Sequence, residues 1–325
     1  MKEARFIKTK KKRWEELEKT IRQKEAKTPD ELASMYIELS DDLAFSQTFY
    51  PRSETTAYLN ELALYFHRRI YRNKKEDRGR FLRFWMEEIP DTYYKARWAM
   101  LISFIIFLIS ALIGAISTHV DPDFVRLILG DAYVDMTLEN IRKGDPMAVY
   151  SSMKEDSMFA MITTNNIRVS FIVFAFGFLG PFLSAALLIQ NGIMLGCFQY
   201  FFYQHHALSI SAQAIWIHGT IEITSIVIAG GAGIYLSSGF LFPGTYTRLE
   251  KFRETAKDGM KIVIALVPFF FIAGFLESFV TRYYQNIFVS LPVIIISLGL
   301  VFWYFVYFPI MKHRYAQRIR ETGTV

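Results

Sequence analysis

The sequence contains one cysteine, Cys197, and it lies inside an apolar run. An intrachain disulfide is therefore excluded, and cysteine usage gives no information on the redox compartment. The first residues, MKEARFIKTKKKRWEELEK, lack the apolar stretch and the small-residue cleavage site of a secretory signal peptide, so we expect none to be cleaved. Any insertion into a membrane must then be directed by segments further along the chain.

Charged residues are also scarce. They make up 21% of the chain against 52% for hydrophobic residues, and a soluble domain with this balance would have to hide too much apolar surface. Lys and Arg are concentrated in residues 1–97, 246–261 and 312–320, which is typical of a membrane protein with basic cytoplasmic segments. The net charge of +6 is explained by topology and by attraction to anionic lipid head groups. We expect membrane lipid as a partner and no nucleic acid.

Recognisable catalytic motifs are missing as well. The sequence has no HExxH, no GxSxG and no paired aspartate motif within an apolar run. We therefore predict that the protein is not an enzyme. A metal-dependent membrane hydrolase is the weakest of the functional hypotheses.

Long apolar runs dominate the rest of the chain. About 20 residues are needed to cross the hydrocarbon core as a helix. This requirement predicts six transmembrane helices near 97–118, 167–189, 190–206, 213–237, 262–283 and 288–311. The third is polar at its far end, where Gln199, Tyr203 and Gln204 lie, so a tilted or partly re-entrant segment is the alternative there. The predicted fold is an all-α polytopic membrane helix bundle.

The connecting segments predict the orientation. Acidic residues outnumber basic ones in 119–166, which we assign to an extracytoplasmic, acidic helical loop. The connection 238–261 and the tail 312–325 are basic and are assigned to the cytoplasm. Both termini are then cytoplasmic, residues 1–96 form a basic cytosolic helical domain, and 167–311 hold the second to sixth spans.

Three ionisable residues fall within the predicted spans, where a central charge costs roughly 2.5–3.5 kcal/mol on insertion scales. His218 and Glu222 are four residues apart on one helix face, and Glu277 is expected at a similar depth on the next span. Asn166, Arg168 and Arg282 are placed by the predicted boundaries near the same level. One interpretation is a polar clasp between helices. The other is a site for a metal ion, another cation or a proton, with the three residues as candidate ligands.

Small residues predict where helices approach closely. The packing candidates are Gly177, Gly180, Gly219, Gly230, Gly231, Gly233 and Gly274. Asn191 and Gly192 predict a tight turn between the second and third spans. Such faces are compatible with a homodimer, and they serve packing within one chain equally well.

Three segments together resemble the stage II sporulation protein M family of bacterial membrane proteins. They are NNIRVSFIVFAFGFLGPFLSAALLIQNGIMLG, HGTIEITSIVIAGGAGIYL and AGFLESFVT, and the His-Gly-x-x-Glu phrase at His218, Gly219 and Glu222 is the most specific part. The phrases ELSDDLAFSQTFYP and YLNELALYFHRRIY look like the cytosolic extension of the longer members. The resemblance implies a multi-pass protein of the bacterial cytoplasmic (inner) membrane.

The resemblance also implies a role. The sporulation member of the family acts as a membrane scaffold for peptidoglycan-degrading partners, but it is shorter and lacks the basic extension, so the sporulation role is not carried over. Our first functional hypothesis is a non-enzymatic scaffold or assembly protein, linked to cell-envelope remodelling, that docks protein partners on 1–96 and 119–166. The alternative is a transporter or channel that uses the His/Glu cluster for a cation, a proton or a charged substrate.

Overall fold

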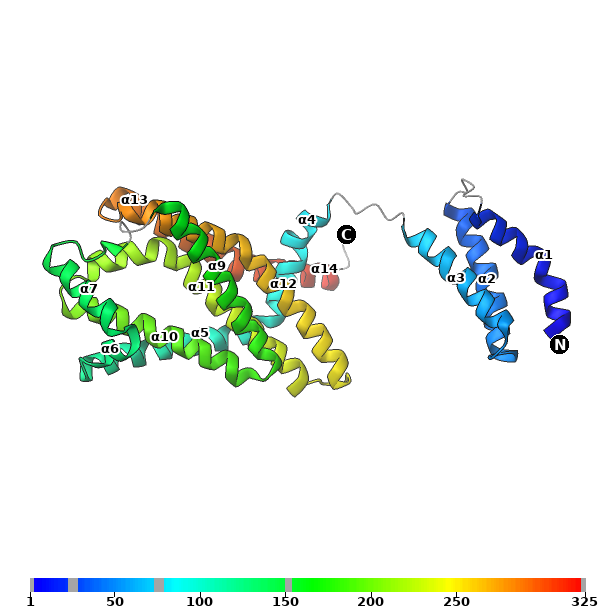
Figure 1. The fold of residues 1–325 in the computed structure, drawn as a ribbon, viewed down its shortest axis with the longest axis horizontal. Helices are drawn as coiled ribbons and strands as arrows, with labels where there is room; N and C mark the ends of the chain where they lie inside the picture. The colour runs from blue at the N-terminus through cyan, green and yellow to red at the C-terminus, as the bar shows by residue number, and fades with distance from the viewer. Residues whose placement is uncertain (1–2, 23–28, 73–78, 150–153, 323–325) are drawn as a thin grey trace. The chain divides into compact units, whose positions relative to one another are not determined.

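A computed structural model describes residues 3–22, 29–72, 79–149 and 154–322, and this described part is helical and contains no strand (Figure 1). The all-α prediction is confirmed. The chain divides into two compact units, Met1–Arg80 and Phe81–Val325. The boundary predicted at residue 96 therefore lies too late, because residues 81–96 pack with the second unit.

The first unit consists of α1 (Glu3–Arg22), α2 (Pro29–Phe49) and α3 (Glu54–Arg72). Pro29 opens α2, where its missing N–H costs no helical hydrogen bond. The Ser53 hydroxyl accepts a hydrogen bond from the Thr56 N–H at the start of α3. The three helices bury one core, which consists of Phe6, Trp14, Leu17, Leu39, Leu59, Leu62, Ala63 and Phe66.

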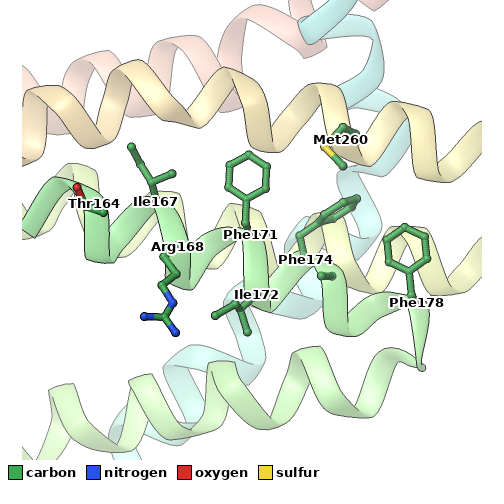
Figure 2. Close-up of a pocket in the computed structure, with 9 residues that line it drawn as sticks. Thr164, Ile167, Arg168, Phe171, Ile172, Phe174, Phe178 and Met260 are labelled. Carbon is green, nitrogen blue, oxygen red and sulfur yellow. The ribbon is translucent and has the colours of Figure 1, made fainter.

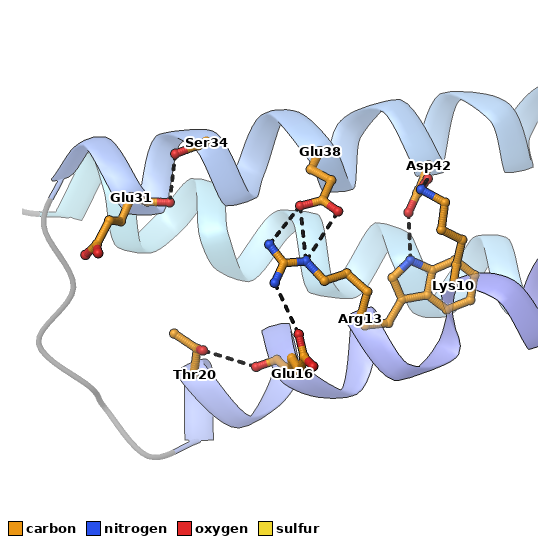
Figure 3. Close-up of polar contacts among 9 residues, drawn as sticks. Lys10, Arg13, Glu16, Thr20, Glu31, Ser34, Glu38 and Asp42 are labelled. Atoms are coloured by element: carbon orange, nitrogen blue, oxygen red, sulfur yellow. Dashed lines mark hydrogen bonds and ion pairs between the residues drawn. The ribbon is translucent and has the colours of Figure 1, made fainter.

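Polar contacts between α1 and α2 fix how these two helices pair (Figure 3). The Arg13 Nη2 donates to Glu38 Oε2 at 2.9 Å, and this hydrogen bond lowers the pKa of the Glu38 carboxyl. The indole of buried Trp14 donates to Asp42 Oδ2 at 2.9 Å, and Lys10 pairs with Asp42 Oδ1 at 3.0 Å. Asp42 thus satisfies a polar group inside the core.

We expect Asp42→Ala to loosen the first unit, because it leaves the Trp14 N–H buried without its acceptor, at about 1–3 kcal/mol. The measurement is the rate of limited proteolysis within residues 3–72 of the full-length protein. Asp41→Ala is the matched control, because Asp41 is the exposed neighbour. Equal cleavage rates in the two variants would contradict the role of Asp42.

In the second unit, six helical segments among the described residues are long and apolar enough to cross a membrane, as predicted. They are Arg80–Val120, Glu155–Phe178, Pro181–Gln204, Leu208–Leu241, Arg248–Tyr283 and Ile287–Ile319. The first contains α4 (Arg80–Arg83), the π-helical η1 (Phe84–Glu88) and α5 (Ile89–Val120). The second contains α9 (Glu155–Ala175) and η2 (Phe176–Phe178), and the third is α10 (Pro181–Gln204).

The remaining spans follow in order. The fourth is α11 (Leu208–Leu241), and the fifth joins α12 (Arg248–Phe275), the π-helical η3 (Leu276–Val280) and η4 (Thr281–Tyr283). The sixth joins α13 (Ile287–Phe302), η5 (Trp303–Tyr307) and α14 (Phe308–Thr322). Two short helices, α6 (Phe124–Leu129) and α7 (Asp131–Arg142), connect the first span to the second. Helix α11 packs against α5, α9, α10 and α12 and forms the centre of the bundle.

The predicted turn at Asn191 and Gly192 is wrong, because both residues lie inside α10. The chain reverses instead at Leu179 and Gly180, where Gly180 adopts a φ of 135°, a backbone conformation that favours glycine, and Pro181 opens α10. The second span accordingly begins at Glu155 rather than 167, and the connection predicted over 119–166 ends before it.

Five of the predicted packing glycines face other helices. A Cβ on Gly177 would meet the Gly233 carbonyl, and Gly230, Gly231 and Gly274 face Leu188, Met100 and Thr163, respectively. Two predictions were wrong. Gly180 has open space around it, and the nearest side chains to Gly219 are Ile215 and Ile223 of its own helix.

Charge separates the two ends of the bundle. We define the basic side by the level at which Lys95, Lys261 and Lys312 form ion pairs, with Asp258 at 3.4 Å, Glu88 at 2.6 Å and Asp91 at 3.0 Å, respectively. The acidic side carries α6 and α7, where Arg126 pairs with Asp131 and Asp135. With six spans, both ends of the second unit lie on the basic side, which the positive-inside rule assigns to the cytoplasm.

Candidate functional site

Three ionisable side chains meet inside the bundle. His218 and Glu222 come from α11, and Glu277 comes from η3. One ligand atom of each lies within 4.8 Å of those of the other two, and His218 Nε2 is 3.8 Å from Glu277 Oε1. His218 is buried, at 5% exposed, whereas Glu222 and Glu277 are partly buried. The structure thus brings together the three residues that the sequence placed at one depth.

The local helix geometry explains the arrangement. Four residues of regular α-helix bring His218 and Glu222 to one face of α11. Glu277 lies in a five-residue π-helical segment, in which the Thr281 N–H bonds to the Leu276 carbonyl, five residues back. Single π-helical turns inside α-helices occur frequently at functional sites.

Hydrogen bonds define which nitrogen of His218 faces the carboxylates. Thr281 Oγ1 lies 3.1 Å from the Leu276 carbonyl and 3.1 Å from His218 Nδ1. A carbonyl only accepts, so the Thr281 proton goes to Leu276, and the hydroxyl must accept from His218 Nδ1–H. In the neutral imidazole, Nε2 then presents its lone pair toward Glu277. This is the tautomer that binds a cation or a proton at Nε2.

Further polar groups surround the cluster. Asn166 of α9 lies within interaction range of the Glu222 carboxyl, yet its buried Nδ2 makes no hydrogen bond of good geometry within the described part of the chain. The same holds for Thr163 Oγ1, which lies beside Gly274, and for Ser278 Oγ, next to Glu277 in sequence. Buried polar atoms are normally paired, so the unpaired Asn166 Nδ2 beside Glu222 indicates room for a ligand.

The two arginines of the predicted cluster lie elsewhere. Arg282 pairs with Glu155 at 2.5 Å, in the first turn of α9, and donates to the Ser278 carbonyl at 3.2 Å. Arg168 is exposed on another face of α9. Both placements correct the prediction. They follow from the start of α9 at Glu155, which shifts Arg168 from the end of its span to the middle.

Thr281 is the contributor that the sequence analysis did not identify. It follows Glu277 by four residues, so the same spacing rule that linked His218 to Glu222 was available. Thr163 and Ser278 were also not predicted, because hydroxyl residues are common in membrane helices and carry no charge that would mark them as unusual there.

A large apolar groove lies on the other side of α11. Its volume is about 1470 Å³, and α5, α10, α11, α13 and η5 line it. Trp216, Ile223 and Thr224 are the α11 residues nearest to the site in sequence that line this groove. They lie on the opposite face of the helix from His218 and Glu222 at 3.6 residues per turn. The groove and the cluster are therefore separate features.

The fold and the site define a polytopic α-helical membrane protein with a histidine and two glutamates enclosed in its bundle. The family model of stage II sporulation protein M matches residues 103–282, more than half of the chain and all of the cluster. The chain belongs to this family. Residues 4–72, the helices of the first unit, match a second model described as a domain of unknown function, DUF8413. Comparisons with curated proteins and with solved structures gave no match.

Proposed function

We propose that the protein binds a divalent cation at His218, Glu222 and Glu277 and carries it across the bacterial cytoplasmic membrane. The carrying observation is the enclosed cluster itself, with ligand atoms within 4.8 Å of one another. One imidazole and two carboxylates suit Zn²⁺ and similar first-row metals. A divalent ion would balance the charge of two neighbouring carboxylates, which otherwise repel each other in a low dielectric.

The depth of the cluster supports transport rather than a structural metal. His218 lies ten residues after Leu208, so it is about 15 Å along α11 from the acidic side. Ionisable residues this deep in a bilayer are rare and mark ion paths or proton relays. The Thr281 hydroxyl, which orients the imidazole, would act as the second shell of such a site.

Cation uptake into proteoliposomes tests the proposal. The purified full-length protein is reconstituted with a metal-sensitive dye inside the vesicles, and Zn²⁺ or Mn²⁺ is added outside. We expect uptake well above that of protein-free vesicles. Uptake equal to that of protein-free vesicles for both ions would refute transport of these ions.

The orientation of His218 provides a sharper variant test. Thr281→Val keeps the side-chain volume but removes the acceptor for His218 Nδ1–H, so we expect cation affinity to fall roughly 10- to 100-fold, as for other second-shell changes. Thr281→Ser is the control, because it keeps the hydroxyl. Isothermal titration of each purified variant with Zn²⁺ measures the difference. Equal affinities in the two variants would argue against this role of Thr281.

A scaffold is the second candidate function, and the first unit favours it. This unit has its own core, and it still exposes apolar side chains on α2 and α3, with Ile37 62% and Leu64 47% exposed. Exposed apolar groups of this kind suit protein docking. Deleting residues 1–78 would abolish partner binding by a scaffold and would leave cation uptake by the second unit unchanged.

A further inference from the structure

Arg168 is a charged residue on an exposed face near the middle of the second span. It lies about 20 Å from the acidic-side end of its span at Glu155 and about 15 Å from the basic-side end at Phe178, at 1.5 Å per residue. Its side chain is exposed, and within the described residues no acidic side chain pairs with it. A charge at this depth facing lipid costs roughly 2.5–3.5 kcal/mol. Something outside the chain therefore has to satisfy it.

The surroundings of Arg168 form a shallow groove (Figure 2). The cavity has a volume of about 590 Å³, and one stripe of the second span lines most of it, through Thr164, Ile167, Arg168, Phe171, Ile172 and Phe178, with Met260 of α12 at its margin. In Figure 2 the guanidinium points away from Met260 and α12. The stripe is apolar apart from Thr164 and Arg168. Such an apolar stripe is typical of a face that packs against another helix, and Arg168 is the positively charged side chain within it.

The positive charge of Arg168 indicates that the partner of this face carries a negative charge. A lipid phosphate lies at the membrane surface, roughly 15 Å from the centre of the hydrocarbon core, so Arg168 meets one only when its side chain extends toward the basic side. Among the residues that the structure describes, a second copy of this chain offers no exposed carboxylate at this depth. Its mid-span acids, Glu222 and Glu277, belong to the buried cluster, and Asp258 is buried beside Lys95 at the basic end.

We propose that this face of α9 binds a transmembrane helix of a different protein, and that an Asp or Glu near the middle of that helix pairs with Arg168. Intramembrane ionisable residues commonly pair with one another, and the pair would remove the cost of both charges. The apolar stripe supplies the van der Waals packing on which helix association in membranes depends. This inference is independent of the cation site, because Arg168 does not contact it.

Disulfide cross-linking to synthetic helices tests the pairing. The full-length protein carrying Ile172→Cys is reconstituted in phosphatidylcholine vesicles with a leucine-rich transmembrane peptide that bears one cysteine. Three versions of the peptide have Asp, Asn or Leu at the centre. We expect the Asp peptide to cross-link roughly tenfold more than the Leu peptide, which corresponds to about 1.4 kcal/mol. Ile296→Cys, on an exposed face of α13, is the matched control and should show no preference.

Changing the charge at position 168 gives the second part of the experiment. Arg168→Gln should abolish the preference for the Asp peptide, and Arg168→Asp should prefer a peptide with a central Lys. The comparison of Asp, Asn and Leu peptides uses the native arginine, so it decides the question even when an Arg168 variant fails to fold. Equal labelling by all three peptides would overturn the proposal.

Two other occupants are also distinguished. If Ile172→Cys chains cross-link to each other in preference to the Asp peptide, the face is an interface between copies and the proposal fails. If replacing phosphatidylcholine with phosphatidylglycerol removes the preference for the Asp peptide, an anionic lipid satisfies Arg168 and the proposal fails as well.

Discussion

Changing both Glu222 and Glu277 to Gln is expected to abolish cation binding and to leave the cation-free protein equally or more stable. The two carboxylates are the charged ligands of the cluster, so their loss removes most of the electrostatic attraction for a divalent ion. In the absence of the ion, the same change removes two neighbouring buried charges, and replacing buried charges by neutral groups is often neutral or stabilising. A binding site and a structural clasp therefore predict opposite effects on stability.

The measurement combines elemental analysis of the detergent-purified protein with thermal unfolding followed by tryptophan fluorescence. We expect the wild type to hold one ion per chain and to lose thermal stability when a chelator removes it. We expect the double variant to hold no ion, so that the chelator leaves its melting temperature unchanged. Glu254→Gln is the control, because Glu254 is exposed near the basic end of α12. A wild type without metal, together with a strongly destabilised double variant, would show that the cluster is a clasp.

The second large effect concerns the contact between α5 and α10. An added Cβ on Gly196 would clash with the backbone carbonyl of Ala111, and a backbone atom cannot swing aside as a side chain can. We expect Gly196→Ala to destabilise the bundle by about 3 kcal/mol, at the upper end for overpacked sites. Gly299→Ala is the control, because nothing lies within 4 Å of that position.

The two alanine substitutions should move the melting temperature in opposite directions. In a helix without a steric clash, Gly→Ala is stabilising by up to about 1 kcal/mol, so Gly299→Ala should raise the melting temperature while Gly196→Ala lowers it. The measurement is thermal unfolding of both variants in the same detergent. An equal shift in both would show that α5 and α10 can move apart at little cost.

The depth of each ionisable residue along its predicted span was enough to predict that the three residues of the cluster lie at one level. His218, Glu222 and Glu277 could be aligned because α11 and α12 each have one long apolar run, so their midpoints follow from the sequence. The boundary between the second and third spans did not follow in this way. Residues 167–206 are apolar almost throughout, and Asn191-Gly192 has the composition of a turn although a helix tolerates it. The Gly180-Pro181 pair was the correct signal for the reversal.

That single error explains the misplacement of Arg168. Counting from a span start at 167 puts this residue at the membrane surface, where a cation needs no explanation. Counting from Glu155 puts it in the middle. Three glycines allow the close contact between α5 and α10, and the sequence analysis did not identify this packing role; they are Gly114, Gly192 and Gly196. Such a role depends on which helix faces meet, and the sequence of one helix does not show which helix packs against it.

The π-helical segment Leu276–Val280 is equivalent to one residue inserted into an α-helix. Because an α-helix turns about 100° per residue, the insertion rotates all later residues by that angle. Gly274, before the segment, packs against Thr163, whereas Thr281, after it, reaches His218. The loss of a single codon here would leave the packing before the segment in place and turn Thr281 away from His218. In evolutionary terms, one small deletion removes this contact and one small insertion restores it, while the same bundle is kept.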